Sequence, residues 1–332
     1  MKADEHHQNL QPAKKREKAL TINKFNGKTL TPPVPVYLPW NLSTKQFKEL
    51  LPDNPEHGEP AFGFPALRNW LTKLVNIMDA QNDKSHPFNN DPYQLRELDI
   101  EAADWFKKDK LGFVKLQSSI ENRTGWVPGA VFLRGGSVAI LFIVQPEGAE
   151  GEDEKQVILT VQPRIAASSL AFTEIPAGML DEEESSFAGK AAKEIKEETG
   201  LEIKESELLD MTKLALEGLP SDPLSAAESL EEAMYPSPGA CDESITLYLC
   251  QKRLKREHLE ELEGSATGLV KEGENIKLKL VPLTRLWREG ARDAKALAAL
   301  SLYENLKKIG MLPDMPNQLD QRSEEWTSKK RE

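Results

Sequence analysis

A glycine turn followed by a run of carboxylates constrains this chain more than any other feature of its sequence. The turn is formed by residues 176–179 (PAGM), and Glu194, Glu197 and Glu198 follow at spacings of three and four residues. On a helix, these three side chains project from one side, and Gly200 stands where such a helix would end. Because like charges repel, the helix either faces solvent or binds cations, and Mg²⁺ prefers carboxylate oxygens.

A solvated acidic surface is the alternative, because Asp and Glu make up 54 of the 332 residues and acidic helix faces are common. The surrounding sequence favours the cation site. A strand-like segment, residues 170–175, precedes Gly178, and an acidic loop, residues 181–184, follows it. Strand, glycine turn, acidic loop, carboxylate helix and glycine stop together form an order suited to binding metal-bound phosphates.

This segment resembles the Nudix box, which has glycine, five residues, glutamate, seven residues and then Arg-Glu-aliphatic-x-Glu-Glu-x-Gly-aliphatic. Residues 193–201 (KEIKEETGL) match its second half, with Lys193 in place of arginine, so a point charge replaces a planar fork. The preceding loop is one residue longer. Counting back from the helix places Ser185 at the first glutamate of the box, and counting forward from Gly178 places Glu184 there. The plant-type ADP-sugar pyrophosphatases look similar in this lengthened loop.

Two later segments resemble the nucleotide-sugar and ADP-ribose pyrophosphatases of the same family. Residues 235–239 (YPSPG) look like their Ser-Pro-Gly loop, and residues 268–276 (GLVKEGENI) look like the mobile acidic loop that closes their active site. Residues 129–135 and 286–288 are also similar to the plant-type enzymes. The order of these segments after the box strengthens the resemblance.

The resemblance implies an α/β fold, in which a Nudix α/β/α sandwich with a mixed sheet covers residues 135–312. Before it, residues 31–134 are expected to form an N-terminal α+β extension, in which a helix at residues 65–80 precedes the strands. Residues 1–30 and 313–332 are polar and are expected to be tails. Related enzymes dimerise by exchanging N-terminal elements, so we expect a homodimer in which the extension also covers the substrate.

The resemblance also implies a metal site. Glu194 and Glu198 are expected to be ligands of Mg²⁺, with Mn²⁺ as the alternative ion. The backbone carbonyl of Ala177, which the glycine turn exposes, is expected to add another oxygen, and Glu274 is the ligand expected from the closing loop. A pyrophosphate repels an incoming hydroxide, so its hydrolysis needs cations at the phosphate oxygens and a base for the water.

The base and the substrate contacts follow from the same resemblance. Glu272 is expected to accept the proton of the attacking water, with Glu274 as the alternative base. Glu197 is expected to bind the metal or its water. Arg164 resembles the arginine that contacts substrate phosphate in this family, because a guanidinium matches phosphate geometry. Ser237 and Gly239 are expected near the sugar end of the substrate.

The sequence thus predicts an enzyme that hydrolyses an ADP-sugar, ADP-ribose or ADP-glucose, to AMP and a sugar phosphate. UDP-glucose is the alternative substrate within the same chemistry, and a catalytically weak nucleotide-binding scaffold is the alternative from another class. No Ser-His-Asp order, Walker loop or dinucleotide-binding pattern supports a competing enzyme class.

Charge and hydropathy limit the partners. The net charge of -11 argues against nucleic acid as the main partner, because phosphate backbones are bound by Lys and Arg. The most apolar stretch, residues 138–144, is far shorter than the ~20 residues that span a bilayer, so no membrane partner is expected. Asp4 and Glu5 argue against a transit peptide, and the basic run at residues 14–18 leaves a nuclear signal open. We therefore expect a cytoplasmic protein, and a nuclear location is left open as an addition.

Overall fold

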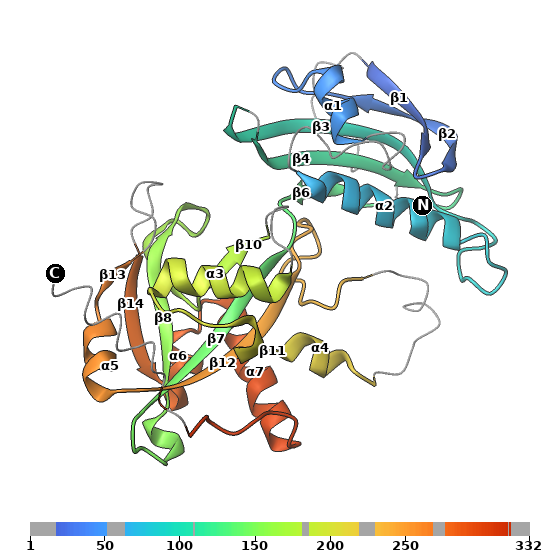
Figure 1. The fold of residues 1–332 in the computed structure, drawn as a ribbon. Helices are drawn as coiled ribbons and strands as arrows, with labels where there is room; N and C mark the ends of the chain where they lie inside the picture. The colour runs from blue at the N-terminus through green and yellow to red at the C-terminus, as the bar shows by residue number, and fades with distance from the viewer. Residues whose placement is uncertain are drawn as a thin grey trace, which may run out of the picture. The chain divides into compact units, whose positions relative to one another are not determined.

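The computed structural model of the 332-residue chain describes residues 18–51, 64–108, 110–180, 186–218, 230–267, 276–317 and 319, and for Glu194 it describes the backbone alone. The chain forms two compact units (Figure 1). The first comprises residues 1–135 together with residues 221–229 and 237–242, and the second comprises the remainder.

The first unit contains a mixed sheet of six strands within the described residues, in the order β1-β2-β3-β4-β5, with β6 also paired to β4. β2 and β3 are parallel and the other pairs are antiparallel. Its elements are β1 (Lys18–Phe25), β2 (Lys28–Tyr37), α1 (Thr44–Leu50), α2 (Pro65–Ala80), β3 (Gln94–Lys107), β4 (Lys110–Glu121), β5 (Trp126–Val127) and β6 (Ala130–Leu133).

The beginning of this unit differs from the predicted polar tail over residues 1–30, because β1 starts at Lys18 and strands precede the helices. Asn26 and Gly27 both have positive φ, 46° and 72°, and join β1 to β2 in a tight hairpin. An Asn-Gly pair favours this turn, since both residues tolerate the left-handed conformation. The helix predicted at residues 65–80 is present as α2, with Pro65 at its first turn.

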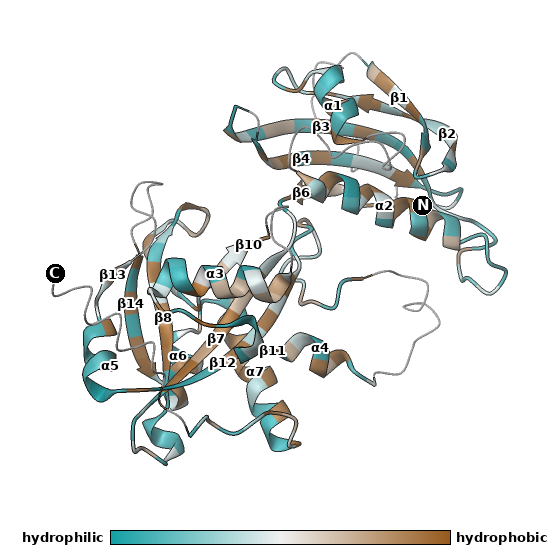
Figure 2. Cartoon of the chain, viewed as in Figure 1, coloured by the Kyte–Doolittle hydropathy of each residue, from teal (hydrophilic) through white to brown (hydrophobic). Residues whose placement is uncertain are grey.

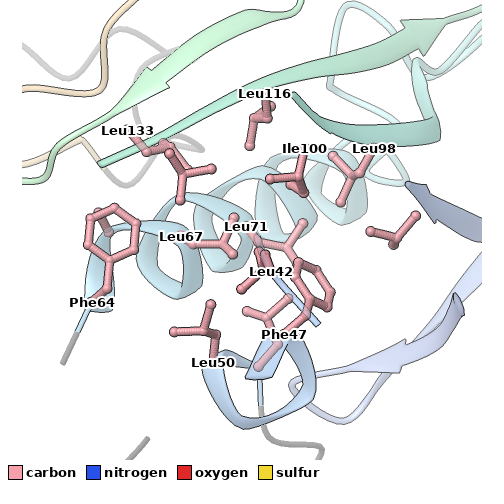
Figure 3. Close-up of a cluster of buried hydrophobic side chains, with 14 of the residues drawn as sticks. Leu42, Phe47, Leu50, Phe64, Leu67, Leu71, Leu98, Ile100, Leu116 and Leu133 are labelled. Carbon is pink, nitrogen blue, oxygen red and sulfur yellow. The ribbon is translucent and has the colours of Figure 1, made fainter. Parts of the chain in front are cut away.

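Helices α1 and α2 bury their apolar side chains against one face of this sheet. Leu67 and Leu71 of α2 are fully buried, as are Leu98 of β3 and Leu116 of β4. Figure 3 shows these side chains together with Phe47 from α1. The first unit therefore has a hydrophobic core of its own.

The second unit contains a mixed sheet of eight strands among the described residues, in the order β11-β12-β7-β8-β14-β13, with β10 also paired to β7 and β9 to β8. β7 and β12 are parallel, and the other pairs are antiparallel. Its strands are β7 (Ser137–Pro146), β8 (Gln156–Arg164), β9 (Ser169–Glu174), β10 (Ala177–Met179), β11 (Leu208–Asp210), β12 (Ile245–Leu254), β13 (Ala266–Thr267) and β14 (Ile276–Pro282). Its helices are α3 (Phe187–Thr199), α4 (Met211–Leu216), α5 (Arg256–Leu262), α6 (Leu286–Glu289) and α7 (Ala294–Lys308).

Both faces of this sheet are covered by helices, as the central strand β7 shows. Every residue of β7 is buried, and the strand is almost continuously apolar (Figure 2). Ile140 and Phe142 pack in the cluster that contains residues of α3 and α5, whereas Ala139 and Leu141 face the cluster that contains residues of α4, α6 and α7. Alternate side chains of a strand point to opposite faces, so the unit is an α/β/α sandwich.

The start of the predicted C-terminal tail is attached to the second unit. Met315 packs against its core, the side-chain amide of Gln251 donates to the Pro313 carbonyl at 2.9 Å, and Arg253 Nε donates to the Pro316 carbonyl at 3.0 Å. The polar composition of residues 313–332 did not reveal these contacts, because the partners of this segment lie in a strand more than 60 residues earlier.

Candidate active site

The strands that carry the predicted site diverge within the sheet of the second unit. β7 and β8 pair only at Ile143↔Val157 and Val144↔Gln156. Beyond this point, β8 pairs with β9 and β7 pairs with β10. Residues of β8 and β10 are therefore not joined by a continuous ladder, and side chains from α3 connect them.

Helix α3 begins and ends at specific residues. The Ser186 hydroxyl accepts the Gly189 N–H at 2.9 Å and donates to Glu205 Oε2 at 2.8 Å. At the other end, Gly200 has φ 74° and its N–H donates to the Lys196 carbonyl, as in a left-handed helix cap. The helix and its stop thus lie where the sequence predicts them.

Glu198 lies on the buried side of α3. Ala191 and Ile195 are fully buried in the core. Ile195 follows Ala191 by four residues and Glu198 follows Ile195 by three, so the Glu198 side chain points in the same direction. Glu198 is 5% exposed, whereas Glu197 is only half-buried. Glu197 and Glu198 are therefore not equivalent, and of these two Glu198 is the one that the fold withdraws from water.

The Glu198 carboxylate connects the two diverging arms of the sheet. One oxygen accepts the side-chain amide of Gln162 on β8 at 3.1 Å, and the other accepts the N–H of Ala177 on β10 at 3.1 Å. A buried carboxylate needs such donors, because taking a charge out of water is costly. The sequence prediction missed Gln162, although it lies only two residues before Arg164 on β8.

The Ala177 carbonyl has the direction that the predicted metal site requires. The Ile140 N–H donates to the Pro176 carbonyl and the Leu180 N–H donates to the Gly136 carbonyl, so alternate residues of β10 bond toward β7. Ala177 lies between these positions, and its N–H and carbonyl both point away from β7, toward the side of Glu198. A carbonyl oxygen and a carboxylate next to each other are a donor set that fits Mg²⁺.

Part of the predicted site lies outside the described residues. These are Glu272 and Glu274, together with Glu184 and Ser185 of the lengthened loop. Among the described side chains, no three His, Cys, Asp or Glu residues lie close enough together to bind a metal. The side chain of Glu194 is not among those described. The roles predicted for these residues stay predictions.

The strands on either side of residues 268–275 are fixed next to α3. Thr267 pairs with Ile276 across β13 and β14. The Thr267 hydroxyl donates to the main-chain carbonyl of Glu198 at 2.5 Å. Thr267 and its partner Ile276 therefore lie beside the helix that carries the carboxylates.

Arg164 lies at the end of β8 and is 41% exposed. Its Nε donates to Glu174 Oε1 at 2.6 Å, and Glu174 is the last residue of β9. The predicted phosphate ligand thus shares β8 with Gln162, the partner of Glu198. The sequence prediction missed Glu174, because the pairing of β8 with β9 places it there.

Ser237 and Gly239 belong to the first compact unit, unlike the helix that carries the carboxylates. The Ser237 carbonyl accepts the N–H groups of Ala240 and Cys241, and the Phe132 N–H donates to the Ala240 carbonyl at 2.7 Å. The Ser-Pro-Gly loop is thereby attached to β6. Burial raises the pKa of the neighbouring Asp242, although its carboxylate accepts the N–H groups of Arg134 and Gly135.

Removal of the Ser186 hydroxyl should destabilise α3. Ser186→Ala leaves the Gly189 N–H without its side-chain acceptor, which typically costs about 1 kcal/mol. We expect this loss in the free energy of unfolding measured by urea denaturation, and Ser301→Ala on the exposed side of α7 should change it by less than about 0.5 kcal/mol. Equal stability of Ser186→Ala and the unsubstituted protein would show that the cap is unimportant.

Comparison with known proteins identifies the family of this chain. A family model described as the NUDIX domain matches residues 135–300, which is half of the chain. Nudix hydrolase 14, chloroplastic, of Arabidopsis thaliana is 35% identical over 248 residues, which are 74% of this chain and 72% of the relative. The chain belongs to the Nudix family. Membership confirms the predicted family, its α/β fold class and the expected class of enzyme, a hydrolase that acts on phosphoric anhydrides.

Among solved structures, a crystal structure of an ADP compounds hydrolase matches with a TM-score of 0.40 and 15% sequence identity. The match covers 66% of this chain and 97% of the other.

The predicted cytoplasmic or nuclear location of this Nudix protein is wrong on the evidence of its relative, which is a chloroplastic protein. Within the part of the chain that the structure describes, no helix is long and apolar enough to cross a membrane.

Proposed function

We propose that this Nudix hydrolase cleaves the pyrophosphate bond of an ADP-sugar, ADP-ribose or ADP-glucose, to give AMP and a sugar phosphate in a Mg²⁺-dependent reaction. The observation that carries the proposal is the position of Glu198, whose buried carboxylate joins the Ala177 peptide of β10 to Gln162 of β8, beyond the point where β7 and β8 diverge. The preference for an ADP-sugar rests on the resemblance of residues 235–239 and 268–276 to enzymes of that specificity.

In this proposal, Glu194, Glu198, Glu274 and the Ala177 carbonyl hold the metal. When bound, Mg²⁺ neutralises charge on the phosphate oxygens and lowers the pKa of a water. Glu198 cannot move freely, since Gln162 and Ala177 each donate to one of its oxygens, and a fixed carboxylate needs no reorganisation during the reaction.

The remaining roles concern the proton and the substrate. Glu272 accepts the proton of the attacking water, with Glu274 as the alternative base, and Glu197 contacts the metal or its water. Arg164 binds a phosphate oxygen through its guanidinium, and Ser237 and Gly239 contact the sugar end of the substrate. The homodimer in which residues 31–134 complete the site also stays a prediction.

A direct test is the release of nucleoside monophosphate from ADP-ribose, ADP-glucose and UDP-glucose, measured with Mg²⁺, with Mn²⁺ and with EDTA. We expect AMP from at least one ADP-sugar and a loss of activity in EDTA, because the phosphate charge is then not neutralised. Preferred release of UMP would select the UDP-glucose alternative. Absence of turnover with every compound and ion would favour a nucleotide-binding scaffold and contradict the proposal.

A further inference from the structure

A chain of four charged side chains extends from Arg164 into the second unit. Arg164 Nε donates to Glu174 Oε1 at 2.6 Å, Lys295 Nζ donates to Glu174 Oε2 at 2.9 Å, and Lys295 Nζ also donates to Asp293 Oδ1 at 2.8 Å. The side chains of Glu174 and Asp293 are 4% and 2% exposed. Two positive and two negative charges alternate, so each buried carboxylate has a cationic partner.

The backbone holds both ends of this chain in place. Glu174 is paired in register with Thr160 of β8, whose hydroxyl donates to the Glu174 carbonyl at 3.4 Å. Asp293 is the N-cap of α7, and its Oδ2 accepts the Ile175 N–H at 3.0 Å. The end of β9 is thereby joined to the start of α7, and Lys295, in the first turn of that helix, lies between the two carboxylates.

Lys295 keeps its charge in this environment. Burial disfavours the charged amine, but attraction to Asp293 and Glu174 outweighs burial and raises the pKa of Lys295 above its usual value. The carboxylate of Glu174 is consequently bound from two sides by permanent cations, and its position is fixed by both.

The contact between Glu174 and Arg164 uses one of the five N–H groups of the guanidinium. A guanidinium has one N–H on Nε and four on its two Nη atoms. Glu174 accepts from Nε, and Arg164 has no other hydrogen-bond or ion-pair partner among the described residues. Among the described residues, the four Nη–H groups of Arg164 thus have no protein acceptor, and the exposure of the side chain gives a ligand access to them.

We propose that Glu174 is a positioning residue for the substrate, which holds Arg164 by Nε so that the two Nη atoms bind the pyrophosphate. This inference rests on the proposed function. Lys295 and Asp293, at the start of α7, hold Glu174 in turn. The position of Arg164 is therefore fixed through Glu174 by its contacts with α7. A side chain that is already ordered loses less conformational entropy when substrate binds.

A double-mutant cycle tests this role. In Glu174→Gln, the single amide oxygen cannot serve both Arg164 and Lys295, and the NH₂ group faces a cation. We expect KM for ADP-ribose to rise about tenfold, the usual effect of removing a residue that orients a ligand group, with a smaller change in kcat. In the Arg164→Ala background, Glu174→Gln should change KM by less than about twofold, because the residue through which it acts is absent.

Calorimetric binding of ADP-ribose in EDTA separates substrate binding from catalysis. The affinity should fall by the same factor as KM rises in Glu174→Gln. An equal loss in the Arg164→Ala background, or unchanged KM and affinity in Glu174→Gln, would overturn the inference.

The control is Glu207→Gln, which also removes a carboxylate from a buried lysine, since Glu207 Oε1 accepts Lys252 Nζ at 2.7 Å. This variant should lose stability but keep its KM.

If Glu174→Gln does not fold, Glu174→Asp retains the charge opposite Lys295 and withdraws the carboxylate from Arg164. It should raise KM as well, and an unchanged KM would overturn the inference. If the unsubstituted protein hydrolyses none of the nucleotide sugars, the proposed function has failed, whereas an active protein with additive variants contradicts only the role of Glu174.

Discussion

Replacement of Glu198 by glutamine should lower kcat/KM for the proposed Mg²⁺-dependent reaction by roughly three orders of magnitude. Charge neutralisation by a bound metal contributes several kcal/mol to such a reaction, and each 1.36 kcal/mol is a factor of ten. The glutamine has the shape of the glutamate but lacks the negative charge that would hold a cation against the Ala177 carbonyl in the proposed site.

The fold should tolerate this change. The glutamine oxygen can accept the Ala177 N–H, and the amide of Gln162 can rotate so that its oxygen accepts from the new NH₂ group. Loss of rate with little change in the urea midpoint would then assign the effect to the site rather than to unfolding.

Glu202→Gln is the matched control for the Glu198 variant. Glu202 follows α3, is largely exposed and pairs with Lys196 at 2.5 Å, so its loss should change kcat/KM by less than about twofold. Measurement of kcat and KM for both variants over a range of Mg²⁺ concentrations completes the test. Full activity of Glu198→Gln at saturating Mg²⁺ would refute the metal site proposed here.

The largest expected loss of stability comes from Phe142→Ala. Phe142 is fully buried in β7, in the same cluster as Ile195 of α3, and removal of a buried aromatic ring costs about 3–5 kcal/mol. The free energy of unfolding of the second unit, followed by circular dichroism in urea, should fall by this amount. α3 should lose packing as well, because the cavity opens beneath it.

Leu297→Ala on α7 is the comparison for this variant. Leu297 is 40% exposed and alanine favours helix, so the change should be within about 0.5 kcal/mol. A loss below about 1 kcal/mol for Phe142→Ala would mean that β7 is not the centre of the core.

Local sequence patterns account for much of this fold. The continuous apolar run in β7, the apolar spacing in α2, and the carboxylate helix that ends at Gly200 each depend on neighbours within a few residues, and each could be predicted. The hairpin at Asn26 and Gly27 was also available from the sequence and was overlooked, because the charged residues around it suggested a tail.

Other features depend on residues that are far apart in the chain. Arg164 meets Glu174 across β8 and β9, and Glu174 meets Lys295 more than 100 residues later. No periodicity connects such positions, since the pairing of strands and the packing of α7 bring them together. The attachment of residues 313–316 to β12 was missed for the same reason.

The sequence by itself determined that Glu194, Glu197 and Glu198 share a helix, because helical periodicity is set by the backbone. Only the tertiary structure decided that Glu198 is buried between Gln162 and Ala177, because burial depends on which strands lie beneath the helix. The same holds for Arg164. Its partner Glu174 is placed by the pairing of β8 with β9 and is held by Lys295 at the start of α7.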